Sequence, residues 1–292
     1  MESNERIAVI TGASSGLGLV TARALASQGW RIIGHGRDPE RIAAAEAAIR
    51  AEAAPGVRID MVRGDLALLS EAERIAADIA QLTDRIDVLI NNAGGVAAAK
   101  KITAEGNEAT FTGNHLGHFV LTERLLPLLR KAAADAKPGA TRIINTSSSA
   151  HEVSPGLDWD DVQSLVNFDE NRAYCNVKLA NILYTKALAR RLAGSGIVVH
   201  AMHPGAVATR FFTYGNEFMQ EYGRTNPLIS AEEGADTLTW LATAEEPAQS
   251  TGGYWHERKQ VPPTDFAQSD ENAERLWEES EKIVAATMQP AA

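Results

Sequence analysis

Two side chains in the sequence have the types and the spacing for acid–base chemistry. Tyr174 and Lys178 lie four residues apart, and on a helix such positions share one face about one turn apart. A tyrosine in water has a pKa of about 10, and a cation within about 4–6 Å lowers it. A shift of about 3 units needs about 4 kcal/mol, which a lysine and a second cation in a dry site could supply. The pair is therefore a candidate general acid or base; the alternative is a solvated helix edge.

A glycine-rich turn near the start of the chain has the composition of a phosphate-binding site. Residues 7–10 are apolar and predict a strand, which leads into Thr-Gly-Ala-Ser-Ser-Gly-Leu-Gly at residues 11–18. Glycines allow a tight turn and close approach to the backbone, and the helix expected next offers free N–H groups. Strand, glycines and helix in this order favour a bound dinucleotide over a glycine turn without a ligand.

The end of the second expected strand, residues 31–35, indicates which dinucleotide binds. Rossmann folds that bind NAD carry an acidic residue near the end of this strand, and it contacts the ribose hydroxyls. This sequence has Gly36 followed by Arg37. Because a guanidinium grips a phosphate with charge-assisted hydrogen bonds, the pattern favours the 2′-phosphate of NADP. The alternative is an exposed arginine at a strand end.

Five further strands are expected, and polar segments follow four of them. The strands cover residues 57–62, 87–90, 142–146, 197–202 and 253–255, and the segments begin at Asp65-Leu66, Asn91-Asn92-Ala93-Gly94, Ser147-Ser148-Ser149 and His203-Pro204-Gly205. Helices are expected to about residue 29, over 39–53, from a Ser70/Glu73 capping box, over 108–130 and 174–192, from a Ser230/Glu233 box to about 243, and over 273–286. Parallel strands keep their ligand contacts at their carboxyl ends, so we expect the polar segments to lie together.

Three reactive residues have competing interpretations. His115 and His118 are spaced i, i+3 and could hold a metal, but no third ligand cluster accompanies them, so packing or interface roles are favoured. Cys175 is either a reactive thiol beside Tyr174 or a small helix neighbour, and the second interpretation is favoured. As the single cysteine, it excludes an internal disulfide. We predict no metal site.

The composition limits the class of protein. The 292 residues are 45% hydrophobic and 23% charged, which suits one large α/β domain or two small ones. The net charge of -10 argues against nucleic acid or an anionic membrane as a partner. No segment approaches the roughly 18 apolar residues of a spanning helix, and the start of the chain lacks a signal-peptide pattern. We expect no membrane span and a cytoplasmic location.

The segment after Thr209 is unusually aromatic. It contains Phe211, Phe212, Tyr214, Phe218 and Tyr222, without the alternation of a strand. We interpret residues 209–229, called below the aromatic segment, as a lid over an apolar substrate. The alternative is a buried pair of helices.

Several motifs in this order resemble the short-chain dehydrogenase/reductase family. They are residues 11–18, Asn91-Asn92-Ala93-Gly94, the set of Ser148, Tyr174 and Lys178, and His203-Pro204-Gly205 with Thr209. The resemblance runs from about residue 7 to residue 255. Within the family, residues 111–122 and the runs INTSSSAH, RAYCNVKLAN and TGGYW resemble the retinol-dehydrogenase-like branch. The stretch between Ser148 and Tyr174 is longer than in the plainest members, which matches a branch with an inserted loop.

The resemblance implies four catalytic residues. Tyr174 would be the general acid or base, and Lys178 would lower its pKa and bind the nicotinamide ribose. Ser148 would orient the substrate oxygen, with Ser147 as the alternative. Asn114 would support a water-mediated proton relay.

The resemblance also implies a cofactor site for NADP(H). Asp65 and Leu66 would lie at the adenine, Asn92 at the ribose side and Thr209 at the carboxamide. The expected cofactor-binding residues are Gly12, Ser14, Ser15, Gly16, Leu17, Gly18, Arg37, Asp65, Leu66, Asn92, Ala93, Gly94, Tyr174, Lys178, Pro204, Gly205, Val207 and Thr209.

The implied fold is a single Rossmann-type, doubly wound α/β domain over residues 1–292. It would have about seven parallel strands with helices on both faces, a substrate lid at about 209–229 and a helical tail at about 264–292. The family often pairs subunits through the helices corresponding to residues 108–130 and 174–192, so a homodimer or homotetramer is expected.

The implied activity is that of an NADP-dependent carbonyl reductase or alcohol dehydrogenase acting on a bulky, largely apolar small molecule. Two alternatives remain. One is reduction of an activated C=C bond, as in the related light-dependent protochlorophyllide reductases. The other is a redox-sensing protein that binds NADP without chemistry, but such proteins usually lose the tyrosine or the lysine, and this chain has both.

Overall fold

An eight-stranded sheet runs through the middle of the structure, a computed structural model that describes residues 5–289. The strand order is β3-β2-β1-β4-β5-β6-β7-β8, in which β1 to β7 pair in parallel and β8 is antiparallel to β7. The strands are β1 Ile7–Ile10, β2 Arg31–Gly36, β3 Ile59–Arg63, β4 Val88–Asn91, β5 Thr141–Thr146, β6 Ile197–Met202, β7 Tyr254–His256 and β8 Lys259–Gln260. The predicted Rossmann-type class and the seven parallel strands are confirmed.

The strand order reverses direction at β1 and β4, which pair with each other although two strands separate them in the sequence. In open α/β sheets, ligands bind outside the carboxyl ends of the strands at such a switch point. The register keeps these ends level, since Ile10 pairs with both Gly34 and Ile90, and Asn91 pairs with Asn145. The loops that carry the predicted site residues therefore emerge along one edge of the sheet.

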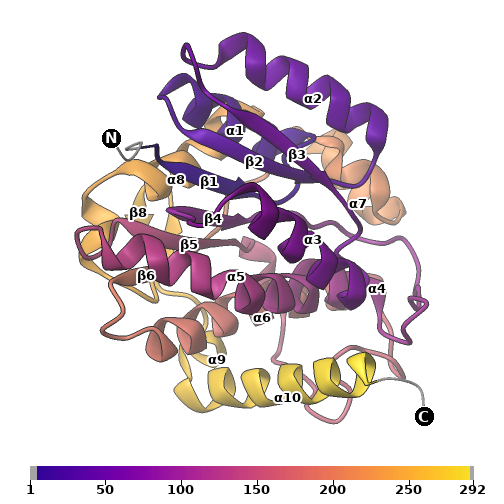
Figure 1. The fold of residues 1–292 in the computed structure, drawn as a ribbon. Coiled ribbons are helices and arrows are strands. Elements are labelled where there is room, and N and C mark those ends of the chain that lie inside the picture. The colour runs from indigo at the N-terminus through magenta and orange to yellow at the C-terminus, as the bar shows by residue number, and fades with distance from the viewer. Residues whose placement is uncertain (1–4, 290–292) are drawn as a thin grey trace.

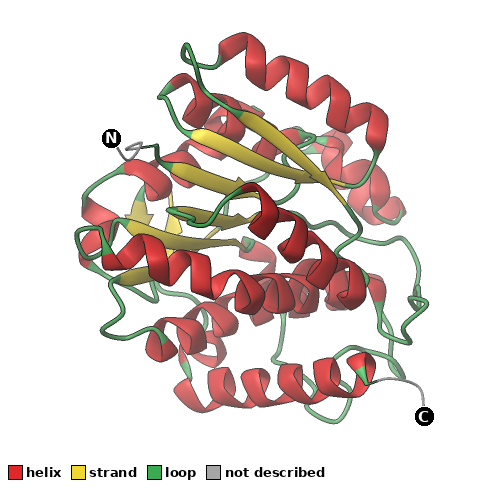
Figure 2. Ribbon diagram, viewed as in Figure 1, coloured by secondary structure: helices red, strands yellow, loops and turns green. Residues whose placement is uncertain are grey.

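Helices cover both faces of the sheet (Figures 1 and 2). One side holds α1 Gly16–Ser27, α2 Pro39–Glu52 and α8 Ala231–Thr243, and the other holds α3 Leu69–Leu82, α5 Gly117–Ala134 and α6 Glu170–Arg191. Alternate residues of β1 enter two separate cores, Ile7 and Val9 on the α3–α5–α6 side and Ala8 and Ile10 on the other. Both faces are apolar because helices bury both, as a parallel sheet requires.

Three helix predictions need comment. The Ser230/Glu233 capping box at the start of α8 is confirmed. The Ser70/Glu73 box is wrong, because α3 begins at Leu69 and its first N–H groups donate to the carboxylate of Glu105, 2.6 Å from Leu69 N. The helix expected over residues 108–130 is interrupted. It consists of α4 Ala109–Phe111, a π-helical turn η1 at Thr112–Leu116, and α5.

The C-terminal helix α10, Asp270–Met288, follows the short helix α9, Asp265–Gln268, and lies along α6 on the side away from the sheet (Figure 1, yellow). Trp277 anchors it, with its ring 4.8 Å from that of Phe119 in α5 and under the guanidinium of Arg191 at 4.1 Å. Subunits were expected to pair through the helices corresponding to residues 108–130 and 174–192. The chain's own α10 packs along α6, and Trp277 contacts Phe119 of α5, so α10 covers part of this surface.

No helix within residues 5–289 combines the length and the apolar character needed to cross a membrane.

Candidate active site

Tyr174 and Lys178 lie on the buried face of α6, beside the carboxyl end of β5. The helix starts at Glu170, and the Asp169 side chain caps it by accepting from Arg172 N at 2.8 Å. Tyr174 is 9% exposed and Lys178 4% exposed, and Lys178 Nζ lies 5.5 Å from the centre of the Tyr174 ring. Lys178 Nζ also donates to the carbonyl of Thr146, the last residue of β5, at 3.2 Å. The predicted pair is therefore brought together at the expected sheet edge.

Burial dominates the electrostatics of this pair. Removal from water raises the pKa of Tyr174 above its usual value, and a hydrogen-bond interaction with Ser148 acts in the opposite direction. Burial also lowers the pKa of Lys178 to about 8. The sequence predicted that Lys178 and a second cation would lower this pKa, and burial acts in the opposite direction. A neutral phenol is the form that can donate a proton.

The two candidate serines have different surroundings. Ser147 is buried, and its hydroxyl donates to the backbone carbonyl of Lys178 at 2.7 Å. Ser148 is half-buried, interacts with Tyr174 and accepts a hydrogen bond from Ala150 N at 3.1 Å. Only Ser148 of these two therefore offers its hydroxyl near the phenol.

Asn114 lies in the π-helical turn η1 and is clamped to the loop after β4. Its side-chain oxygen accepts from Gly95 N at 3.1 Å, and its side-chain nitrogen donates to Gly95 O at 3.0 Å and to Thr110 O at 2.8 Å. A Cβ placed on Gly94 would lie 2.3 Å from Asn114 Oδ1 and 3.4 Å from Lys178 Nζ. Asn114 and Lys178 thus border the same glycine, and the clamp needs that glycine.

The glycine-rich turn has the backbone geometry that only glycine tolerates well. Gly12 and Gly16 have φ values of 70° and 54°. At Gly18, a Cβ would lie 2.5 Å from the carbonyl oxygen of Gly12, so the helix packs directly on the turn. Among the residues that the structure describes, no side chain caps the start of α1, and its first turn has no acidic residue. Ser14 is half-buried and Ser15 exposed beside these N–H groups, which fit a phosphate.

The ribose edge of the predicted cofactor site carries charge. Arg37 is exposed at the end of β2, and its guanidinium lies 3.6 Å from the carboxylate of Asp65. Leu66 is buried, so only its backbone is available to a ligand. Asn92 uses its side-chain nitrogen to donate to Thr11 O at 2.9 Å, which ties the turn after β4 to the turn after β1.

The loop after β6 closes the other side. Thr209 lies beside Gly16, since a Cβ on Gly16 would be 3.4 Å from Thr209 Cγ2. Val207 forms an isolated parallel bridge with Ile229 and packs against α8 at Gly234. Pro204 and Gly205 are half-buried between them and β6, with Gly205 at a φ of 88°. These residues lie along the same edge as the glycine turn.

The aromatic segment forms two short helices, η3 Arg210–Tyr214 and α7 Glu217–Thr225. Both are fully described, and neither contains a buried residue, so the alternative of a buried helix pair is wrong. The Phe211 ring lies 5.1 Å from the Tyr174 ring, and Phe218 is 65% exposed. The segment therefore borders the candidate catalytic tyrosine without being part of a core.

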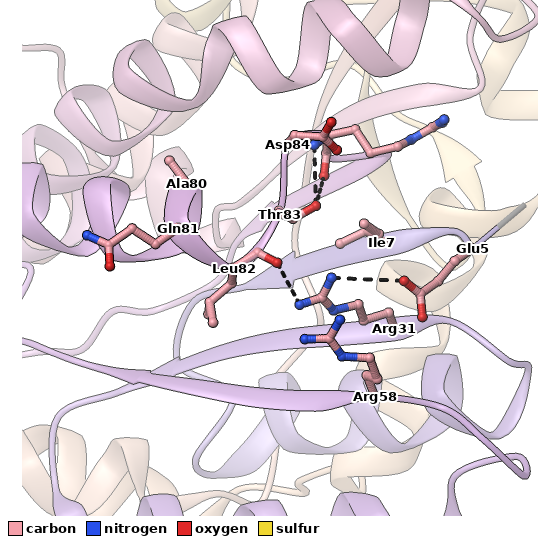
Figure 3. A pocket seen from close by; sticks show the side chains of 10 residues that line it. Glu5, Ile7, Arg31, Arg58, Ala80, Gln81, Leu82, Thr83 and Asp84 are labelled. Carbon is pink, nitrogen blue, oxygen red and sulfur yellow. Dashed lines mark hydrogen bonds and ion pairs between the residues drawn. The ribbon is translucent and has the colours of Figure 1, made fainter. Parts of the chain in front are cut away.

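A hollow at the opposite edge of the sheet does not compete with this site (Figure 3). It has a volume of about 440 Å³ and is lined by Glu5, Ile7, Arg31, Arg58 and residues 80–85. Its arginines already have partners, as Arg31 lies 2.8 Å from Asp60, and Arg85 lies 2.6 Å from Asp87. Ile7 begins β1, so the hollow lies at the amino ends of the strands, away from Tyr174.

Comparison with known proteins gives the family. Residues 6–220 match the family described as short chain dehydrogenase. The chain belongs to this family. Human retinol dehydrogenase 13 is 39% identical over 284 residues, which are 94% of this chain and 83% of that protein, and supports the retinol-dehydrogenase-like branch.

Two further proteins that are similar to this chain bear on ligands. A Streptomyces sp. strain C5 protein, DnrU, named provisionally as a daunorubicin C-13 ketoreductase, is 36% identical over 284 residues, 97% of this chain and 93% of that protein. A solved structure of RhlG from Pseudomonas aeruginosa with NADP in its active site has a TM-score of 0.65 and 28% identity, covering 85% of this chain and 93% of that one.

Two residues beside the candidate site, Thr11 and Arg41, were not among the site residues predicted from the sequence. Thr11, which opens the glycine-rich motif, is fully buried and accepts hydrogen bonds from the N–H groups of Asn92 and Ala93, each at 2.9 Å. Arg41 in α2 donates to the Tyr214 hydroxyl at 3.2 Å and joins the ribose edge to the aromatic segment. Its position in the first turn of a helix beside Arg37 was the available signal.

His115 and His118 contact different partners and are not paired as metal ligands. His115 contacts the Ser280 hydroxyl of α10 at 2.8 Å, whereas His118 contacts the Thr11 hydroxyl at 2.9 Å. Within residues 5–289, no three or more His, Cys, Asp or Glu residues are grouped so that they could hold a metal. For Cys175, burial raises the pKa of the thiol, which favours the unreactive neutral form.

Proposed function

We propose that this short-chain dehydrogenase is an NADP(H)-dependent oxidoreductase that interconverts a carbonyl and an alcohol on a bulky, largely apolar substrate. The observation that carries the proposal is the meeting of Tyr174, Ser148 and Lys178 at the sheet edge beside the glycine-rich turn. A phenol, a hydroxyl and an ammonium at one point can donate, orient and support a proton transfer to oxygen.

The cofactor would lie along the carboxyl edge of the sheet. The free N–H groups at the start of α1, with Gly12, Gly16 and Gly18, would hold its diphosphate. Leu17 lies at the start of α1, and Ala93 and Gly94 lie in the turn after β4. Val207 and Thr209 face these residues from the loop after β6. When bound, the nicotinamide supplies or accepts the hydride.

The chain's own residues would manage the proton. Tyr174 would give a proton to the carbonyl oxygen during reduction, and its raised pKa keeps the phenol protonated near neutral pH. Ser148 would orient the same oxygen. Lys178 and Asn114, which border Gly94 together, would lead the replacement proton to Tyr174 through water.

The preference for NADP(H) rests on the charge at the ribose edge. Arg37 is exposed there, and Arg41 lies in the first turn of α2. Gly36 places no carboxylate that would repel a 2′-phosphate. The related RhlG structure, which contains NADP, supports the same choice.

The substrate class rests on the aromatic segment. The Phe211 ring lies 5.1 Å from the Tyr174 ring and contacts Phe212, whose ring stacks on that of Tyr222 at 5.6 Å. These rings offer apolar contact area without belonging to a core, as a lid would. The named relatives, a retinol dehydrogenase and a daunorubicin ketoreductase, point to large ring-bearing substrates.

A screen of NADPH consumption tests the proposal. Aliphatic aldehydes, aromatic ketones, steroids and retinoids would be compared. Each ketone would be paired with an enone, and analysis of the enone's product would show whether the C=O or the C=C bond was reduced. We expect kcat/KM to be highest for ring-bearing or long-chain carbonyls. Faster turnover of short hydroxy acids would remove the apolar-substrate claim, and saturation of the C=C bond alone would favour the alternative reductase.

Cytoplasmic location and assembly into two or four copies stay predictions. The helix α10 packs along α6 and occupies that part of its surface within the chain itself. Analytical ultracentrifugation of the full chain would measure the number of copies.

A further inference from the structure

His118 is a buried histidine in the first turn of α5 that the proposed reaction does not use. Its Nδ1 lies 3.2 Å from the backbone carbonyl oxygen of Asn114, and its Nε2 lies 2.9 Å from the hydroxyl of Thr11. A carbonyl oxygen can only accept, so Nδ1 carries the hydrogen and the bare Nε2 accepts from the hydroxyl. One neutral tautomer satisfies both contacts.

The charge state of His118 is fixed by its surroundings. Burial lowers its pKa to about 3 and outweighs the hydrogen bond to the Asn114 carbonyl, which acts in the opposite direction. The ring therefore stays neutral across the pH range in which enzymes work, and the tautomer that both contacts require is kept.

Thr11 connects His118 to the two turns of the cofactor site. Its hydroxyl oxygen accepts from the N–H groups of Asn92 and Ala93 and lies 3.3 Å from Ile90 O, so its hydrogen is best placed toward His118 at 2.9 Å. Asn92 returns a bond to Thr11 O. The side chain of His118 is thus joined to the turn after β1 and to the turn after β4 through one hydroxyl.

Asn114 is held at both ends as a result. Gly95 binds its side-chain amide, and His118 binds its backbone carbonyl. The residue lies in a π-helical turn, and such turns inside α-helices are frequent at functional sites. The amide oxygen so placed borders Gly94 together with Lys178 Nζ.

We propose that His118 is a positioning residue for carbonyl–alcohol interconversion. By bonding to both the Asn114 carbonyl and the Thr11 hydroxyl, it holds Asn114, which lies on the side of the proton relay, in a fixed position relative to the turns that would bind the cofactor. This inference rests on the proposed function, because the position of Asn114 matters only if Asn114 and Lys178 serve proton transfer to Tyr174.

His115 provides a matched control on the same stretch of chain. It is as deeply buried as His118, and burial likewise lowers its pKa to about 3. Its Nε2 contacts Ser280 of α10, and its ring meets the edge of Tyr184 at 5.6 Å. The two histidines share burial and charge state, but only His118 contacts the residues of the site.

The experiment compares His118→Leu, His118→Gln and His115→Leu with the wild type. The measurements are kcat and KM for the best carbonyl of the screen, the NADPH dissociation constant by calorimetry, and the melting temperature. We expect His118→Leu to lower kcat by about 10- to 100-fold while NADPH affinity changes less than about threefold. His118→Gln, whose amide can donate to the carbonyl and accept from the hydroxyl, should recover kcat to within about fivefold.

His115→Leu separates positioning from packing. It should lower the melting temperature and leave kcat per folded molecule within about twofold of the wild type. Equal losses of kcat in His115→Leu and His118→Leu, or a His118→Gln variant as slow as His118→Leu, would overturn the inference.

Nitrogen NMR of the histidine rings tests the geometry without any activity. We expect His118 to show a protonated Nδ1 and a bare Nε2 that do not titrate between about pH 5 and pH 9. The opposite tautomer would overturn the inference. A wild-type protein that turns over no carbonyl but shows this tautomer would instead overturn the proposed function, so the two failures are distinguishable.

Discussion

The two sides of the candidate site are built in opposite ways. On the α6 side, Tyr174 and Lys178 are almost fully buried, and Ser147 and Asn181 hold the end of β5 against the helix. On the side of the aromatic segment, η3 and α7 contain no buried residue, and Phe218 is 65% exposed.

This difference separates two tasks. Side chains that move a proton need fixed distances, and close packing supplies them. A surface that receives a bulky substrate can be loosely packed, and loosely packed segments open at little cost in free energy. We expect changes on the α6 side to act on kcat, and changes in the aromatic segment to act on KM.

The largest effect is expected from Gly94→Ala, which disturbs the closely packed α6 side of the site. The added Cβ would lie 2.3 Å from Asn114 Oδ1, so Asn114 or the turn must move. Because a displacement of about 1 Å at a catalytic group can cost about 100-fold in rate, we expect kcat to fall by about that factor. Steady-state kinetics at saturating NADPH would measure it.

The neighbouring glycine gives the control. At Gly95 a Cβ would meet nothing within 4 Å, and its backbone bonds to Asn114 would survive. Gly95→Ala should keep kcat within about threefold of the wild type. Similar losses in the two variants would show that the close approach at Gly94 is not what holds Asn114.

The next effect concerns the ribose edge of the cofactor site, which belongs neither to the α6 side nor to the side of the aromatic segment. A charge-assisted contact is worth about 1.5–3 kcal/mol, so Arg37→Ala should weaken NADPH binding by about 10- to 100-fold and leave NADH binding nearly unchanged. Calorimetry with both cofactors would measure this, and equal losses would show that Arg37 does not contact the 2′-phosphate.

The obvious reverse substitution, Gly36→Asp, is unsuitable as a test. A Cβ on Gly36 would lie 2.8 Å from Ser14 Cβ and 2.9 Å from Ile42 Cγ1. The carboxylate would arrive together with a distorted glycine turn, so lost NADPH binding could not be assigned to charge. The absence of a side chain here has a packing reason as well as an electrostatic one.

What the sequence predicted well depends on backbone geometry or on local pattern. Gly12 and Gly16 have positive φ values that their motif requires, and the Tyr174–Lys178 spacing places both on one face of a real helix. The Ser230/Glu233 cap is equally local.

What it missed depends on residues far apart in the chain. Glu105 caps α3 in place of the predicted box, and α10 packs along α6. The raised pKa of Tyr174 is also a tertiary effect, because it comes from burial that the four-residue spacing does not show. The link from His118 to Thr11 joins two motifs that look independent in the sequence.

A smaller effect, about tenfold, is expected from pH. Burial lowers the pKa of Lys178 to about 8, so the ammonium loses its proton as the pH rises through that value, while Tyr174 stays protonated. The rate of reduction should be level below about pH 7.5 and fall about tenfold per unit well above pH 8. A profile that stays level to pH 10 would show that the charge of Lys178 is not required.

The smallest effect is expected on the side of the aromatic segment. Phe211→Leu should raise KM for ring-bearing carbonyls by about three- to tenfold and change the free energy of unfolding by less than about 1 kcal/mol. Phe119→Leu, in the core against Trp277, should lower stability and spare KM. If Phe211→Leu lowered kcat and stability instead, the contrast between the two sides would be wrong.

The central claim is that Tyr174 is the acid and base of an NADPH-linked carbonyl reduction, and Tyr174→Phe tests it most directly. The change removes one hydroxyl and leaves the glycine turn intact. We predict that the purified variant binds NADPH with wild-type affinity and keeps less than about a tenth of the wild-type kcat, a loss above about 1.4 kcal/mol. A variant that binds NADPH normally and keeps more than that fraction would contradict the claim.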